Sequence, residues 1–250
     1  MIIHLPELPD DPEAPFPDPG TALRDPDGLL AMGGDLSPTR LLNAYANGIF
    51  PWYSEGQPLL WWSPDPRTVF PTHAVHLSRR FRRDLRRSSW QVTADMAFSE
   101  VIDACATIPR PHQPGTWITP AMREAYVAMH ALGHTHSVEV WDGSRLVGGL
   151  YGMAIGQMFF GESMFSAVSG GSKVALAALA AHLQQRGWPL LDAQVANNHL
   201  MSMGGIVWPR DRFLDTVRGL AAGPGEPGNW SDGFGRVPAR SLTFRVDAPV

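Results

Sequence analysis

The chain has 250 residues, of which 44% are hydrophobic, and a formal net charge of −4 at pH 7. This length allows one large domain or two smaller ones with a buried core. The single cysteine, Cys105, excludes an internal disulfide and a zinc site built from several cysteines. The N-terminus has no apolar signal-peptide core, and the longest apolar run, 174–183, is too short to span a bilayer. We therefore expect a cytoplasmic protein that makes no membrane contact.

The first part of the chain predicts a small N-terminal domain over residues 1–66. A Ser-Pro pair opens a helix over 37–47, and Gly48 ends it. The segment that follows is dense in Pro, Gly and Trp. This composition predicts an aromatic-lined loop that includes Trp52.

Three helices and then a set of strands are predicted next. The helices cover an arginine-rich stretch at 76–88, then 95–106, and then 119–132, where Thr119 is a suitable N-cap. An alternating strand at 137–141 leads into Asp142-Gly143, a dipeptide that favours a hairpin turn. The return strand and one further strand follow, so antiparallel pairing is expected.

A long Ala/Leu helix at 172–186 precedes a short buried strand, PLLDAQV, and two more helices at 198–203 and 210–220. Antiparallel strands, a helix and a strand that can insert parallel predict an α+β domain over 67–220. The tail, 221–250, is rich in Gly and Pro and is expected to be peripheral, with a possible strand at 241–246.

One carboxylate lies in a strand where apolar residues are expected. Glu162 sits in the segment GESMFS, next to phenylalanines and methionines. Burying a carboxylate without a partner is costly, so this position favours a functional site. Strand alternation places Glu162, Met164 and Ser166 on one face. The alternative is a glutamate at a solvated strand edge.

A second polar pair, Asp192 and Gln194, lies in the short strand before 198. Residues two apart in a strand share a face, so Asp192 is expected to accept a hydrogen bond from the Gln194 amide. The alternative is that Asp192 accepts backbone N–H groups where the strand meets a loop.

Two further features point to anions rather than metals. Ser169-Gly170-Gly171-Ser172-Lys173 precedes a helix and could hold an anion, although Ser172 could equally be a simple N-cap. Six arginines fall within nine residues from Arg79 to Arg87, which suggests a specific anionic partner. The nine histidines form no metal-binding motif, so no metal is expected.

Several long segments resemble the leucyl/phenylalanyl-tRNA–protein transferase family. They follow one another from about residue 16 to 218, and the most distinctive are GLLAMGGDLSPTRLLNAYANGIFPWYS, LLWWSPDPR, HSVEVW, LVGGLYG, GESMFS and LLDAQ. The resemblance implies a small N-terminal domain and a catalytic domain like the acetyl-CoA-dependent N-acyltransferases. It implies no cofactor, because the acyl donor is an aminoacyl ester of tRNA.

The resemblance also implies an activity. Members of the family move Leu or Phe, and Met less well, from aminoacyl-tRNA to the N-terminal Arg or Lys of acceptor proteins. The added residue marks the acceptor for degradation through the N-degron pathway. A monomer is expected.

The family's functional positions map onto this sequence. Its proposed catalytic pair corresponds to Asp192 and Gln194, and its amino-group ligand to Glu162. Its substrate-binding residues correspond to adenosine-contacting tryptophans and a pocket for the donor side chain: Trp52, Trp117, Leu150, Phe159, Met164, Ser166, Leu176, Leu179 and Leu191. Its tRNA-binding cluster corresponds to Arg79, Arg86 and Arg87.

The chemistry that follows needs no strong base. An α-amine with a pKa of about 7.7–8 is partly neutral near pH 7, and orientation supplies much of the rate. Gln194 is expected to orient this amine, polarised by Asp192, while Glu162 binds the ammonium of the donor. Two alternatives stay open, a CoA-dependent N-acyltransferase on the same fold and a non-catalytic RNA-binding module.

Overall fold

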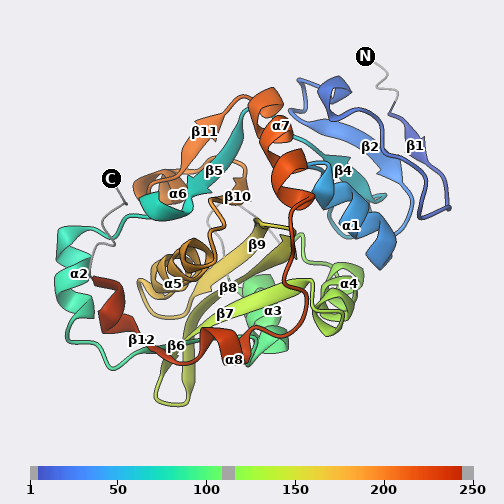
Figure 1. Ribbon diagram of the computed structural model, residues 1–250. Helices are drawn as coiled ribbons and strands as arrows, with labels where there is room; N and C mark the ends of the chain where they lie inside the picture. Colours follow the sequence, from blue (N-terminus) through green and yellow to red (C-terminus); the bar gives the residue numbers. More distant parts are fainter. Residues whose placement is uncertain (1–4, 109–115, 244–250) are drawn as a thin grey trace.

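The computed structural model describes residues 5–108 and 116–243. The smaller of two sheets is built from the N-terminal part of the chain and has the strand order β1-β2-β4-β3 (Figure 1). Its strands are β1 (Glu7–Leu8), β2 (Leu29–Gly33), β3 (Phe50–Pro51) and β4 (Leu60–Trp62). Helix α1 (Pro38–Ala46) connects β2 to β3, and its N-cap Ser37 accepts a bond from the backbone N–H of Arg40.

The larger sheet has eight strands in the order β11-β5-β10-β9-β8-β7-β6-β12. Its pairings are antiparallel except for β9 with β10, which is parallel. The mixed α+β class and the parallel insertion of β10 are therefore confirmed. The strands are β5 (Arg67–Pro71), β6 (Gln91–Ala94), β7 (Thr135–Asp142), β8 (Arg145–Ile155), β9 (Met158–Ser166), β10 (Leu190–Gln194), β11 (Ile206–Trp208) and β12 (Val237–Pro238).

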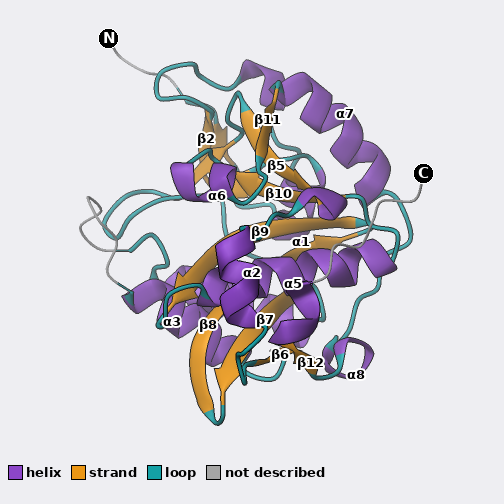
Figure 2. Ribbon diagram, turned by 90° about the vertical axis from the view of Figure 1, so that its left-hand side faces the viewer, coloured by secondary structure: helices purple, strands orange, loops and turns teal. Residues whose placement is uncertain are grey.

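Helices cover both faces of the larger sheet (Figures 1 and 2). Helix α5 (Gly171–Gln185) packs on one face, and α3 (Phe98–Thr107) and α4 (Pro120–Ala131) pack on the other. Apolar residues gather in two buried clusters, one toward α5 and one between the sheet, α3, α4 and the N-terminal part. The remaining helices are α2 (Arg79–Leu85), α6 (Asn198–Ser202), α7 (Arg210–Ala221), α8 (Ser231–Phe234) and the 3-10 turns η1 (Pro19–Thr21), η2 (Thr72–Ala74) and η3 (Ala239–Thr243).

Most predicted elements are present, with bounds that differ by a few residues. Thr119 caps α4 by accepting from the backbone N–H of Met122, and the Asp142-Gly143 hairpin joins β7 to β8. The possible strand at 241–246 is wrong in its described part, because 239–243 form η3. The hydroxyl of Ser241 bonds to the carbonyl of Pro238, a local contact that favours a turn over a strand. Residues 244–246 lie outside the described residues.

No helix in the described part of the chain combines the length and the apolarity that a membrane crossing requires.

Candidate functional site

A cleft of about 1240 Å³ lies along the ends of β9 and β10, beside the start of α5. It brings together most of the residues expected at the site, although these come from distant parts of the sequence. The exceptions are Asp192, which is fully buried, and Arg79, Arg86 and Arg87, which do not line the cleft. The expected residues that line the cleft are Trp52, Trp117, Leu150, Phe159, Glu162, Met164, Ser166, Leu176, Leu179, Leu191 and Gln194.

A β-bulge in β9 places Glu162. Tyr151 of β8 pairs with Ser163 and Gly152 pairs with Gly161, so Glu162 is an extra residue with no partner across the strand. A bulge re-aims side chains and shifts the alternation of the residues beyond it. The prediction that Glu162 and Met164 share a face is therefore wrong: Glu162 bonds to tyrosines of α1 and α4, whereas Met164 packs with the cluster beside α5.

A second bulge, in β10, places Gln194. Asp192 pairs with Val69 and Gln194 pairs with Thr68, which leaves Ala193 as the extra residue. Gln194 has a φ of 59°, a left-handed conformation that is uncommon outside glycine. Strained backbone of this kind is concentrated at functional sites. Because β9 and β10 are neighbours, the two bulges bring Gln194 and Glu162 together.

Glu162 is buried and accepts three hydrogen bonds from protein groups. The hydroxyls of Tyr45 and Tyr126 donate over 2.6 and 3.1 Å, and Nε2 of Gln194 donates over 2.9 Å. The two tyrosine hydroxyls also bond to each other. Burial raises the pKa of Glu162 to about 7, and repulsion from Asp192 adds to this against the opposing hydrogen bonds. The carboxyl group therefore changes charge near neutral pH.

Asp192 is held by Arg67, a residue that the sequence reasoning missed. Nε and Nη2 of Arg67 donate to the two carboxylate oxygens over 2.8 and 2.6 Å, and both side chains are fully buried. Nη1 of Arg67 donates to the carbonyl of Gly48. The only sequence signal was an arginine at the head of a strand whose last three residues are apolar, RTVFP.

The expected hydrogen bond between the Asp192 carboxylate and the Gln194 side-chain amide is absent from the structure. Asp192 instead accepts the backbone N–H of Gln194 over 3.0 Å, as the alternative interpretation proposed. The side-chain amide of Gln194 donates to Glu162. The bulge at Ala193 is the reason, since it turns the Gln194 side chain away from that of Asp192.

Apolar side chains make up much of the cleft wall, and two tryptophans stand at different depths. Trp52 is 37% exposed and Trp117 is 8% exposed. The indole N–H of Trp62 donates to the carbonyl of Trp52 over 2.6 Å, which fixes the backbone at the rim. The apolar wall and the Glu162–Gln194 pair therefore line the same cleft.

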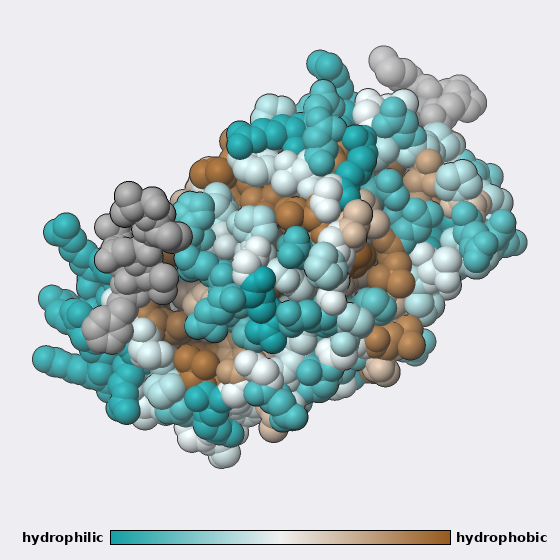
Figure 3. Space-filling model, in the orientation of Figure 1, coloured by the Kyte–Doolittle hydropathy of each residue, from teal (hydrophilic) through white to brown (hydrophobic). Residues whose placement is uncertain are grey.

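The arginine-rich segment lies beside the start of α5. Arg79, Arg86 and Arg87 are exposed, and hydrophilic atoms stand out along the edge at which Figure 1 draws α2 (Figure 3). Phe81 of α2 packs on Gly170, where an added Cβ would lie 2.3 Å from the ring. Basic charge therefore flanks the start of α5.

The start of α5 differs from the simple capping that Ser172 suggested. Gly170 is the N-cap, with a φ of 94° and no side-chain capping bond. The backbone N–H of Ser172 instead donates to the Ser166 hydroxyl over 2.8 Å. Lys173, the only lysine in the sequence, lines the cleft nearby. Among the described residues, no cluster of His, Cys, Asp or Glu is arranged to hold a metal ion.

A cleft with apolar walls and a hydrogen-bonded carboxylate and amide, on a mixed α+β sheet, is a candidate ligand-binding site. Comparison with known proteins identifies the family. Residues 34–65 and 69–218 match the models of the N-terminal and main domains of leucyl/phenylalanyl-tRNA protein transferase. The chain belongs to this family and is an aminoacyltransferase.

Curated relatives support the assignment along nearly the whole chain. The leucyl/phenylalanyl-tRNA–protein transferase of Xanthomonas axonopodis pv. citri is 67% identical over 97% of this chain and 98% of its own length. That of Xylella fastidiosa is 59% identical over 92% and 95%. Among solved structures, L-PGS from Bacillus licheniformis covers 68% of this chain and 54% of its own, with 9% identity and a TM-score of 0.38, too low to identify the fold.

Proposed function

We propose that the cleft binds the aminoacyl end of Leu- or Phe-tRNA, and Met-tRNA less well, and transfers the amino acid to the N-terminal Arg or Lys of an acceptor protein. The observation that carries this proposal is the hydrogen-bonded pair Glu162 and Gln194 in a cleft with apolar walls. The pocket suits an uncharged side chain, and the polar pair suits amino groups. The relatives are named for this donor and this kind of acceptor.

The reaction needs a positioned amine more than a strong base. The acceptor nitrogen attacks the ester carbonyl, a C–N bond forms, and the C–O bond to the tRNA ribose breaks. The amine loses one proton and the leaving ribose oxygen gains one. Because Nε2 of Gln194 already donates to Glu162, its Oε1 is the amide atom that can accept from the attacking amine.

Asp192 acts through other groups in this proposal. Its carboxylate is neutralised by Arg67 and accepts the Gln194 backbone N–H, so it fixes the left-handed backbone that aims Gln194. Glu162 is the carboxylate that lines the cleft, and it is the group placed to pair with the donor ammonium. Its raised pKa allows it to hold or release a proton near neutral pH.

Residues 67–220 form the catalytic domain, which is related to the N-acyltransferases; the strands β6 to β9, helix α5 and the parallel strand β10 support this relation. Residues 1–66 form the small domain that supplies Trp52. Arg79, Arg86 and Arg87 bind the tRNA body, and the protein works as a cytoplasmic monomer whose product is degraded.

The test is transfer of labelled Phe or Leu from charged tRNA to a peptide that begins with Arg. Gln194→Ala and Asp192→Ala should keep tRNA binding and lose transfer by roughly 10²-fold or more, the size expected for a lost positioning group. Gln185→Ala, an exposed glutamine on α5, is the matched control. Wild-type rates in both site variants would refute the assignment.

Two further outcomes separate the alternatives. Consumption of acetyl-CoA in place of aminoacyl-tRNA would favour a CoA-dependent enzyme. Binding of tRNA by the wild-type protein without transfer to any peptide would favour an RNA-binding module.

A further inference from the structure

The segment after α7 packs against the catalytic sheet at several points. It lies beyond residue 218, where the match to the family model ends. Glu226 pairs with Arg186 of the α5 C-cap over 2.6 Å, and the N–H of Gly228 donates to the carbonyl of Gly133 over 3.0 Å. Strand β12 then pairs with β6. This segment is therefore part of the catalytic half of the molecule rather than a loose tail.

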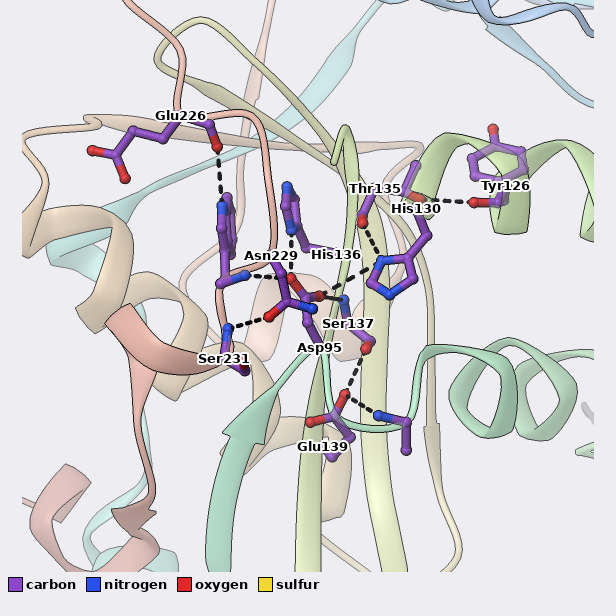
Figure 4. Close-up of polar contacts among 12 residues, drawn as sticks. Asp95, Tyr126, His130, Thr135, His136, Ser137, Glu139, Glu226, Asn229 and Ser231 are labelled. Carbon is purple, nitrogen blue, oxygen red and sulfur yellow. Dashed lines mark hydrogen bonds and ion pairs between the residues drawn. The ribbon is translucent and has the colours of Figure 1, made fainter. Parts of the chain in front are cut away.

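Trp230 is the anchor of the segment. It is 3% exposed, and its backbone N–H donates to Asp95 over 2.8 Å. The Asp95 carboxylate also bonds to His136 and to the backbone N–H of Ser137 (Figure 4). The ring of His136 stacks on the indole of Trp230 at 3.7 Å, with 8° between the planes. The backbone and the ring of Trp230 are thus both fixed.

Trp230 stands directly behind one wall of the cleft. Its indole lies 6.0 Å from the ring of Phe159, a fully buried residue that lines the cleft. The backbone of β8 also approaches this ring, since an added Cβ at Gly152 would lie 2.5 Å from Cε1 of Phe159. The Phe159 ring therefore has the indole of Trp230 and the backbone of β8 as close neighbours.

We infer that Trp230 is a positioning residue that fixes the depth of the donor side-chain pocket and so tunes the choice between Leu and Phe. The inference rests on the proposed function, because it takes the Phe159 wall to be the pocket for the donor side chain. A smaller residue at 230 leaves space behind Phe159, into which the ring can retract. The pocket then becomes deeper, and kcat/KM increases more for the larger Phe side chain than for Leu. Apolar pockets separate substrates by about 10–200-fold per methylene, so small changes in depth are measurable.

The experiment compares kcat/KM for Phe-tRNA and Leu-tRNA with an Arg-initiated peptide. Trp230→Leu should raise the Phe-to-Leu ratio by about threefold or more, a small part of what apolar pockets achieve. Trp230→Phe should raise the Phe-to-Leu ratio by a smaller amount. This more conservative variant replaces Trp230→Leu in the test if Trp230→Leu does not fold. Phe234→Leu is the matched control, since Phe234 is buried in the same segment and packs on His182.

Phe159→Leu distinguishes the two possible failures. If it changes the ratio and neither Trp230 variant does, the role of Trp230 is refuted while the pocket assignment stands. If Phe159→Leu and Leu179→Ala both leave the ratio unchanged, the pocket assignment itself has failed. Trp230→Leu and Phe159→Leu should also be non-additive in a double-mutant cycle, because the two rings are in contact.

Discussion

The side-chain amide of Gln194 donates a hydrogen bond to the carboxylate of Glu162 over 2.9 Å, and each residue owes its position to a bulge in its own strand. The bond links the group that we propose orients the acceptor amine to the group that we propose binds the donor ammonium. A change at either residue should therefore alter the handling of both substrates.

Glu162 should make both transfer and stability depend on pH. Its pKa is about 7 in the folded protein and near 4.5 when unfolded. Between these values the folded state holds more protons, so the free energy of unfolding falls as pH rises from about 4.5 to above 7. Glu162→Gln should therefore be more stable than wild type at pH 8, by at most about 3 kcal/mol, and the gap should close below about pH 5.

Transfer by the wild-type protein should rise with pH through about 7, as the Glu162 carboxylate forms. Glu100→Gln, an exposed glutamate on α3, is the control that should leave both profiles unchanged. Urea unfolding and single-turnover transfer between pH 5 and 9 provide the measurements. A Glu162→Gln protein with the wild-type pH–rate profile would contradict the role of this carboxylate.

The buried Arg67–Asp192 pair should be costly to break. Removing one partner leaves an uncompensated charge, so Arg67→Leu should lower the free energy of unfolding by about 3–5 kcal/mol. Arg67→Leu combined with Asp192→Asn should recover part of this loss. Arg123→Leu is the control, because the Arg123–Asp103 pair is exposed and should cost about 1 kcal/mol or less. If urea unfolding showed the same decrease in the free energy of unfolding for Arg67→Leu and Arg123→Leu, this view would be refuted.

Binding of tRNA should depend steeply on salt. Each arginine that contacts phosphate releases counterions, so replacing Arg79, Arg86 or Arg87 by Gln should weaken binding and reduce the slope of log K against log salt by about 0.7–1. Arg145→Gln, at the far end of the β7–β8 hairpin, is the control. Affinity that stays flat between 50 and 200 mM salt would rule out the electrostatic contact.

Gly152 should tolerate no side chain. An added Cβ would lie 2.2 Å from the carbonyl oxygen of Phe160 and against the ring of Phe159. Gly152→Ala should cost about 1–3 kcal/mol through overpacking and should also disturb the cleft wall. Gly219→Ala, in α7 with open space around it, should instead stabilise by about 0.5–1 kcal/mol. Thermal unfolding of the two variants compares these effects, and opposite signs are expected.

The sequence predicts the elements of this protein better than the geometry of its site. Capping by Thr119 and the hairpin at Asp142-Gly143 depend on a few adjacent residues, so local chemistry is enough to find them. The sheet faces on which Glu162 and Gln194 lie were inferred from the strict alternation of side chains along a strand. A single extra residue, as at the bulges in β9 and β10, moves the following side chains to the opposite face. Arg67 was missed because its partner Asp192 lies 125 residues away.

Glu162 draws its neighbours from both parts of the molecule. Tyr45 comes from α1 beside the smaller sheet, and Tyr126 comes from α4 on the larger one. The Gly48 carbonyl, which also follows α1, holds the arginine behind Asp192. The hydrogen bonds around Glu162 therefore cannot all form until the chain has been made from α1 through Gln194 of β10, and they join the two parts of the molecule at one carboxylate.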